Sequence, residues 1–223
     1  MPAGRRAELL RWAGESADRY ILEDDYDSEF RFDVRPLPSL QGMSGSNGRV
    51  VYLSTFSRCL TPGIRIAYMV LPRHLMPVYE QYYSSYSCTV GRMEQQTLAR
   101  FMASGQFTRH LARLRSAYRK RCTTLRKSFQ EHFRAGSFRT YGEHTGIHFC
   151  LQLIDGPGEK EMVRRAAEAG IRLNGLSRYS MEKSGTQLPP NTVLLGYGAL
   201  KDADIPAAVE RLAGAWRSGS GEK

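Results

Sequence analysis

The sequence predicts an α/β protein with two domains. Short apolar segments alternate with longer segments that have helical periodicity. The apolar runs at 50–53 and 64–71 are bounded by turn residues, which is typical of buried strands. After a long helical pattern the periodicity changes near residue 138 and indicates a smaller α+β layer. We therefore expect one domain at 1–106 and a second at 107–223.

The elements of the first domain are predicted from local patterns. Apolar spacing indicates a helix at 5–18, and the apolar residues at 20–22 indicate a short strand that leads into an acidic run. Prolines and glycines make 36–48 an irregular connection. Pro72 ends the predicted strand at 64–71. After the two buried strands, helices are expected at 75–87 and 92–103.

The second domain is predicted to begin with a helix from about 107 to 134, where apolar residues recur at helical spacing. Gly170 should end a later helix, since glycine favours the position just past a helix C-terminus. Pro206 suits the first turn of the last helix. The other elements are expected as strands at 138–141, 147–153, 171–173 and 193–197, and helices at 159–169 and 205–216.

The net charge of +10 is concentrated in the long helix. Residues 109–139 contain ten Lys or Arg and one acid, Glu131. A basic stripe of this kind can bind nucleic acid. A solvated helix face is the favoured interpretation, because apolar residues at helical spacing occupy the remaining side of the same segment.

Composition limits the class of protein. With 41% hydrophobic and 24% charged residues, the chain can form a folded core. No apolar run reaches the length of a membrane span, and the first residues lack the pattern of a signal peptide, so we expect a cytoplasmic protein. The cysteines have no zinc-binding spacing, which predicts reduced thiols and no metal site; they are Cys59, Cys88, Cys122 and Cys150.

Four motifs occur in order along the chain: EDDYDSEFR at 23–31, PLPSLQ at 36–41, STFSRCLTPGIR at 54–65 and GQFTRHLARLR at 105–115. Together they resemble the aminotransferase-like domain of MocR/GabR-type regulators of the GntR family. Those proteins join an N-terminal winged-helix DNA-binding domain to a fold-type-I pyridoxal-phosphate (PLP) domain. The resemblance implies a partial aminotransferase fold, with part of the large-domain sheet followed by the small C-terminal domain.

The resemblance also implies which residues would hold the cofactor. Asp24 matches the carboxylate beside the pyridine nitrogen, which keeps the ring protonated. Tyr26 matches the phenol near the 3-oxygen of the ring. Arg65 matches the arginine that binds the phosphate with two N–H groups, and Thr55 and Ser57 lie in the hydroxyl-bearing turn. Arg65 is expected inside an apolar strand, where an unpaired charge is costly, so an anionic partner is favoured.

Arg58 stands where the family has the lysine that forms the Schiff base. A guanidinium stays protonated and offers no free amine, so covalent cofactor chemistry is expected to be absent. No lysine near position 58 can replace it; the nearest, Lys120, lies in the basic helix. Arg58 would then either contact the phosphate as an additional cation or face solvent.

Each assignment has a simpler alternative. The carboxylates of the acidic run could form a solvated loop or a metal cluster, although no glycine-bearing calcium loop accompanies them. Thr55 and Ser57 could be turn formers only. Arg178 is a candidate for binding a substrate carboxylate. Leu194 stands near the place where many related aminotransferases have an arginine for that group, which puts amino-acid recognition in doubt.

The resemblance begins in mid-domain, so the sequence is interpreted as a C-terminal fragment that lacks the DNA-binding module and the first half of the PLP domain. A homo-oligomer is expected, since a sheet without its neighbouring strands exposes apolar surface. An amino-acid-like effector is the expected partner besides PLP, and DNA only through the absent domain. Two alternatives remain: a functional dimeric aminotransferase whose site a partner completes, and a basic nucleic-acid-binding module.

Overall fold

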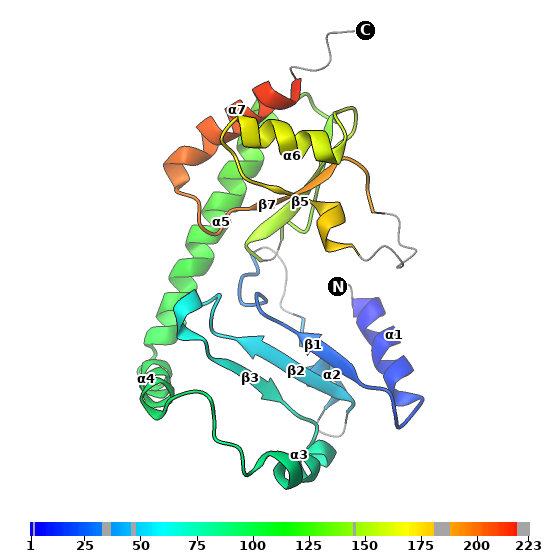
Figure 1. The fold of residues 1–223 in the computed structure, drawn as a ribbon, viewed down its shortest axis with the longest axis vertical. Helices are drawn as coiled ribbons and strands as arrows, with labels where there is room; N and C mark the ends of the chain where they lie inside the picture. The colour runs from blue at the N-terminus through cyan, green and yellow to red at the C-terminus, as the bar shows by residue number, and fades with distance from the viewer. Residues whose placement is uncertain (2, 33–36, 46–47, 145, 181–187, 218–223) are drawn as a thin grey trace. The chain divides into compact units, whose positions relative to one another are not determined.

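Two separate β-sheets organise the chain in the computed structural model, which confirms the α/β class (Figure 1). The structure describes residues 1–223 except 2, 33–36, 46–47, 145, 181–187 and 218–223. Unit 1 comprises Met1–Glu29 and Val34–Ala112, and unit 2 comprises Phe30–Asp33 and Arg113–Lys223. Helix α5 (Gln106–His132) runs from unit 1 into unit 2.

Unit 1 contains a three-stranded sheet in the order β1-β2-β3. β1 (Ile21–Asp24) is parallel to β2 (Val50–Thr55), and β3 (Ala67–Val70) is antiparallel to β2. The carboxyl ends of β1 and β2 therefore meet at one edge of the sheet, where open α/β sheets bind their ligands. Its other elements are α1 (Ala3–Gly14), α2 (Leu40–Ser44), η1 (Pro62–Ile64), η2 (Arg73–Leu75), α3 (Met76–Tyr83) and α4 (Arg92–Ala103).

One predicted strand is wrong in its boundaries, and another is absent from the structure. The strand expected at 64–71 begins only at Ala67, because Pro62 starts the 3-10 turn η1 and the chain leaves that turn through a left-handed residue, Arg65. Residues 171–173 form no strand, and strand pairing in this region is limited to β6 (Asn174–Gly175), which pairs with β7 (Thr192–Gly196). The short helix α2 is an element that the sequence did not predict.

Strand β3 is exposed along its whole length. Tyr68, Met69 and Val70 each keep about 40% of their surface accessible, and Leu22 of β1 keeps 70%. The buried apolar side chains of unit 1 are small in number by comparison; they are Ala13, Leu40, Val50, Val51, Cys59 and Ile66. Exposed apolar surface on a sheet is typical of surfaces that associate with other chains.

Unit 2 contains an antiparallel sheet in the order β4-β5-β7-β6, with Leu151 opposite Val193. Both of these side chains are completely buried. Gly170, just after α6, has φ +75°, which confirms the predicted helix end. The elements of unit 2 not yet given are β4 (Phe138–Tyr141), β5 (His148–Leu153), α6 (Glu159–Glu168), η3 (Leu176–Tyr179), η4 (Asp202–Asp204) and α7 (Ile205–Arg217).

An aromatic cluster joins α5, β4 and α7 within unit 2. Phe129 of α5 is fully buried, and its ring centroid lies 5.5 Å from Phe133, 6.0 Å from Phe138 and 6.4 Å from Trp216. The Trp216 indole N–H also donates to the carbonyl of Met162 in α6 at 3.0 Å. Three helices and the sheet thus share one core.

Four basic residues of α5 bind groups of unit 2 outside the helix. Arg121 and Lys120 both pair with Asp202, at 3.1 and 2.9 Å, and they lower the pKa of that carboxyl. Arg119 donates to the carbonyl of Phe32, and Arg126 lies 3.9 Å from Glu143. These contacts are those of a structural helix face. No helix in the described part of the chain is long and apolar enough to cross a membrane.

Candidate active site

Residues 23–26 divide into two sets because burial alternates along β1 and the two residues that follow it, as successive residues of an extended chain face opposite sides. Glu23 accepts the N–H groups of the first two residues of α2, at 2.8 and 3.0 Å, and so caps that helix. Asp25 accepts the Tyr52 hydroxyl at 3.0 Å and the Ser28 N–H at 3.2 Å. Glu23 and Asp25 therefore have structural roles.

Asp24 and Tyr26 form the second set. Asp24 is the last residue of β1, opposite Leu53, and it is exposed. Its carboxylate makes no side-chain hydrogen bond to any residue that the structure describes. Partial burial raises the pKa of Tyr26, Asp27 and Asp24 raise it further, and Arg58 acts in the opposite direction. Tyr26 therefore stays a neutral phenol that can donate a hydrogen bond.

The turn after β2 is fixed by its own hydroxyl groups. The Thr55 hydroxyl accepts the Ser57 N–H at 3.1 Å, lies 3.0 Å from the Ser57 hydroxyl and donates to the carbonyl of Ile66 at 3.1 Å. The Phe56 N–H donates to the same carbonyl at 3.0 Å. The turn is therefore tied to the start of β3, and Thr55 and Ser57 have the turn-forming role that was the simpler alternative. Their hydroxyl oxygens remain available as further hydrogen-bond partners.

Arg65 differs from its prediction. It lies outside the strand, is exposed, and has φ 51° and ψ 30°. The cost of burying an unpaired charge therefore does not apply to it. A left-handed conformation is uncommon for a residue with a side chain, and such residues cluster at functional sites. In the described part of the chain Arg65 has no ion pair, so its guanidinium can accept an anion from solution.

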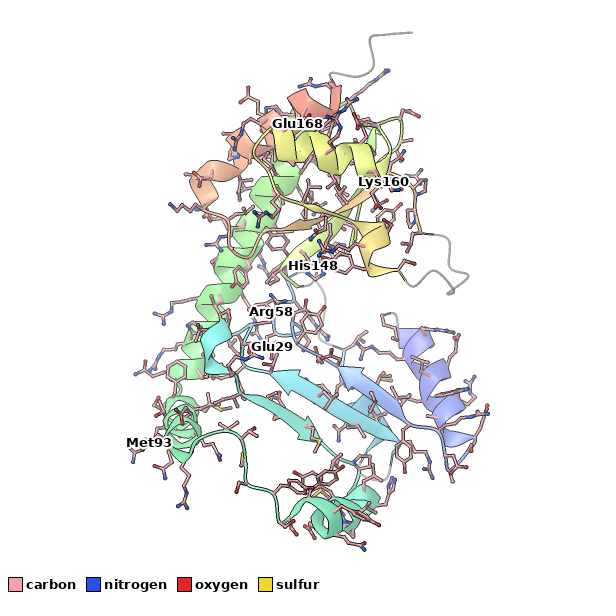
Figure 2. The ribbon with its side chains drawn as sticks, in the orientation of Figure 1. Glu29, Arg58, Met93, His148, Lys160 and Glu168 are labelled. Atoms are coloured by element: carbon pink, nitrogen blue, oxygen red, sulfur yellow. The ribbon has the colours of Figure 1, made fainter. Side chains whose placement is uncertain are left out.

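Arg58 extends from the turn between Ser57 and Cys59, at the edge where β2 ends (Figure 2). Its guanidinium carbon lies 5.9 Å from the centre of the Tyr26 ring, a cation–π contact. Arg58 is exposed, and no carboxylate of the described residues pairs with it. The structure thus brings positions 26 and 58 together.

His110 of α5 forms a hydrogen bond with the backbone of the same turn. The sequence did not predict this contact. Its Nε2 lies 2.9 Å from the carbonyl oxygen of Cys59, the residue after Arg58. Phe107, one turn earlier in the helix, packs against Phe56 with ring centroids 6.0 Å apart. The backbone around position 58 is therefore held both by the β3 carbonyl and by α5. The only sequence signal for this contact was that His110 lies in one of the four motifs.

The reactivity of the Cys59 thiol is a measure of how well this turn is packed. It is 1% exposed, and burial, with a smaller effect of Glu29, raises the pKa of its thiol to about 11. At pH 8 only about one thiol in a thousand would be the reactive thiolate. We expect iodoacetamide to label exposed Cys88 at least a hundred times faster than Cys59, with the Cys59 rate rising as the pH approaches 11. Mass spectrometry of timed samples measures both rates, and equal labelling at pH 8 would contradict the packed turn.

Arg178 belongs to unit 2, in η3, and its guanidinium donates to the Asn174 side chain at 2.9 Å. Leu194 lies in β7 opposite Cys150. Both positions therefore lie in a different unit from the six residues at the end of the first sheet: Asp24, Tyr26, Thr55, Ser57, Arg58 and Arg65. Among the residues that the structure describes, no cluster of three His, Cys, Asp or Glu could hold a metal ion.

The chain matches no protein-family model, but curated relatives match nearly all of it. The HTH-type transcriptional regulator YhdI of Bacillus subtilis is 38% identical over 216 residues, 97% of this chain and 45% of YhdI. The probable rhizopine catabolism regulatory protein MocR of Rhizobium meliloti is 31% identical over 212 residues, 95% of this chain and 41% of MocR. The chain spans less than half the length of either relative.

Solved aminotransferases share the fold. The multiple substrate aminotransferase of Thermococcus profundus matches with a TM-score of 0.83 and 25% identity, over 98% of this chain and 52% of that one. The α-aminoadipate aminotransferase LysN of Thermus thermophilus, complexed with N-(5′-phosphopyridoxyl)-L-leucine, matches with a TM-score of 0.73 and 25% identity, over 96% and 54%.

The fold therefore defines the class: the chain is part of a fold-type-I aminotransferase fold. Its curated relatives make the identification narrower. The chain is a homologue of the MocR-type HTH transcriptional regulators and corresponds to an aminotransferase-like part of them.

Proposed function

We propose that the chain is the effector-binding, aminotransferase-like part of a MocR-type regulator, and that it binds pyridoxal phosphate without a covalent bond and without transamination. The observation that carries the proposal is that Arg58, at the position where the resemblance implies a Schiff-base lysine, lies over the Tyr26 ring. The carboxylate of Asp24, at the end of the adjacent strand, makes no hydrogen bond to the described residues. The residues present therefore fit PLP, except that position 58 lacks the primary amine of a lysine.

Each residue has a physical role in this proposal. Asp24 would accept a hydrogen bond from the protonated pyridine nitrogen and keep it protonated, because an exposed carboxylate at a strand end is free to pair with a cation. Tyr26, held neutral by its raised pKa, would donate a hydrogen bond to the 3-oxygen. Arg65 would bind the phosphate, with the hydroxyl groups of Thr55 and Ser57 beside it. When bound, PLP supplies an electron sink and an aldehyde.

The proposal also includes an absence of transamination, for a chemical reason. Transamination needs a residue that bonds to the aldehyde carbon and then carries a proton, which is the work of a primary amine. The guanidinium of Arg58 is permanently protonated and can do neither. Binding is then the function that remains. An amino-acid-like effector and operator DNA, bound through a domain outside this chain, are the partners that the regulator relatives suggest. A homo-oligomer is suggested by the exposed apolar strand β3.

The proposal is tested by titrating the purified chain with PLP in equilibrium dialysis. We expect saturable binding, and after borohydride reduction we expect intact-protein mass spectrometry to find no added mass. Asp24→Asn should weaken binding at least tenfold, the effect of losing one charged hydrogen bond. Asp18→Asn, which changes an exposed aspartate after α1, is the matched control and should bind like the unaltered chain. Either a stable adduct or the absence of any binding contradicts the proposal.

A further inference from the structure

The Arg58 guanidinium is a planar group with five N–H donors. The structure records a contact of this group with the face of the Tyr26 ring and no pairing with a carboxylate of the described residues. Carboxylates and phosphates are the partners that match its donors, because they accept two parallel hydrogen bonds. An exposed, unpaired arginine fixed beside an aromatic ring is thus a site for an oxyanion.

Resting on the proposed function, we infer that Arg58 makes the site selective for derivatives of vitamin B6 phosphate that carry a carboxylate next to the 4′ carbon. The lysine that the resemblance implies at this position bonds to the aldehyde carbon, so it increases the affinity for ligands that carry the aldehyde. An arginine there gives the aldehyde no advantage and attracts an anionic group in its place. The ligand class is that of phosphopyridoxyl–amino acid conjugates, in which the α-carboxylate lies one carbon beyond the 4′-linked nitrogen.

The neighbouring charges are consistent with this assignment. Asp24 and Asp27 both raise the pKa of Tyr26, which means that their negative charges are felt at the phenol. They would also repel an anionic ligand beside Tyr26 unless a cation paired with that ligand. Arg58 is the described cation that acts on the same phenol. By the resemblance, Leu194 stands near the place where many related aminotransferases have an arginine for the substrate carboxylate, and an apolar side chain cannot bind that group. A carboxylate at this site would therefore depend on Arg58.

The test compares two ligands that differ only in the carboxylate. One is N-(5′-phosphopyridoxyl)-L-leucine, and the other is the conjugate of pyridoxal phosphate with 3-methylbutylamine, which is leucine without its carboxylate. We expect the leucine conjugate to bind the 223-residue chain about tenfold more tightly, as one charged hydrogen bond predicts. Isothermal titration calorimetry measures both dissociation constants.

Arg58→Gln should remove this difference and leave the affinity of the amine conjugate within about twofold, because only the carboxylate loses its partner. Arg11→Gln, which changes an exposed arginine of α1, should keep the tenfold difference. Equal affinities in the unaltered chain overturn the inference and leave the proposed function standing. An equal loss of both ligands in Arg58→Gln also overturns it, since Arg58 would then bind the shared phosphate. Binding of neither ligand overturns the proposed function together with the inference.

Discussion

Replacing Arg58 with lysine is expected to convert non-covalent binding into covalent attachment of PLP. Lysine supplies a primary amine whose unprotonated fraction can attack the aldehyde, whereas arginine has essentially none below about pH 12. The backbone at this position is already held by the Thr55–Ile66 hydrogen bond and by His110 on the Cys59 carbonyl. The substitution therefore needs no rearrangement of the turn.

The measurement is borohydride reduction followed by peptide mapping. We expect the Arg58→Lys chain to carry one phosphopyridoxyl group at position 58 at saturating PLP, against none in the unaltered chain. Arg11→Lys adds a lysine at an exposed position of α1 and serves as the control, which should show no selective labelling of residue 11. If the Arg58→Lys chain binds PLP without labelling at residue 58, then residue 58 does not face the aldehyde, and the interpretation of this turn is wrong.

The sequence predicts the position of the site better than its internal geometry. Turn residues and an acidic run mark the ends of the two strands in the sequence, and the parallel pairing of β1 with β2 places Asp24 and the turn 55–58 at the same sheet edge. The sequence does not separate the acidic residues. Which of them are already bound is decided by distant partners, such as the α2 backbone for Glu23 and Tyr52 for Asp25.

Arg65 shows why the strand prediction fails locally. An apolar run predicts an extended segment, but periodicity cannot detect that Pro62 begins a 3-10 turn inside the predicted region. The short helix α2 was missed for a related reason. Five residues are too few to display helical periodicity, and part of its stabilisation comes from Glu23, 17 residues earlier than its first N–H partner. Interactions distant in sequence decide both features.

The largest effect on stability is expected in unit 2, from Phe129→Ala. Phe129 is fully buried and contacts three other aromatic rings from α5, β4 and α7, so its removal leaves a cavity at the junction of these elements. Comparable truncations of buried phenylalanine reduce the free energy of unfolding by about 3–5 kcal/mol. Because a domain is typically stable by only about 5–15 kcal/mol, the loss should be a large fraction of the total for this unit.

Trp216 provides a reporter for this effect, because it is 2% exposed and stacks on Phe129 with an interplanar angle of 21°. The chain has two tryptophans, and the other, Trp12, belongs to unit 1 and is 46% exposed. In a Trp12→Phe background, tryptophan fluorescence during urea unfolding therefore follows unit 2. Phe133→Ala is the matched control; this ring belongs to the same cluster but is only half-buried, so its loss should cost less than that of Phe129. Equal midpoints for Phe129→Ala and the parent would show that the aromatic cluster does not hold unit 2 together.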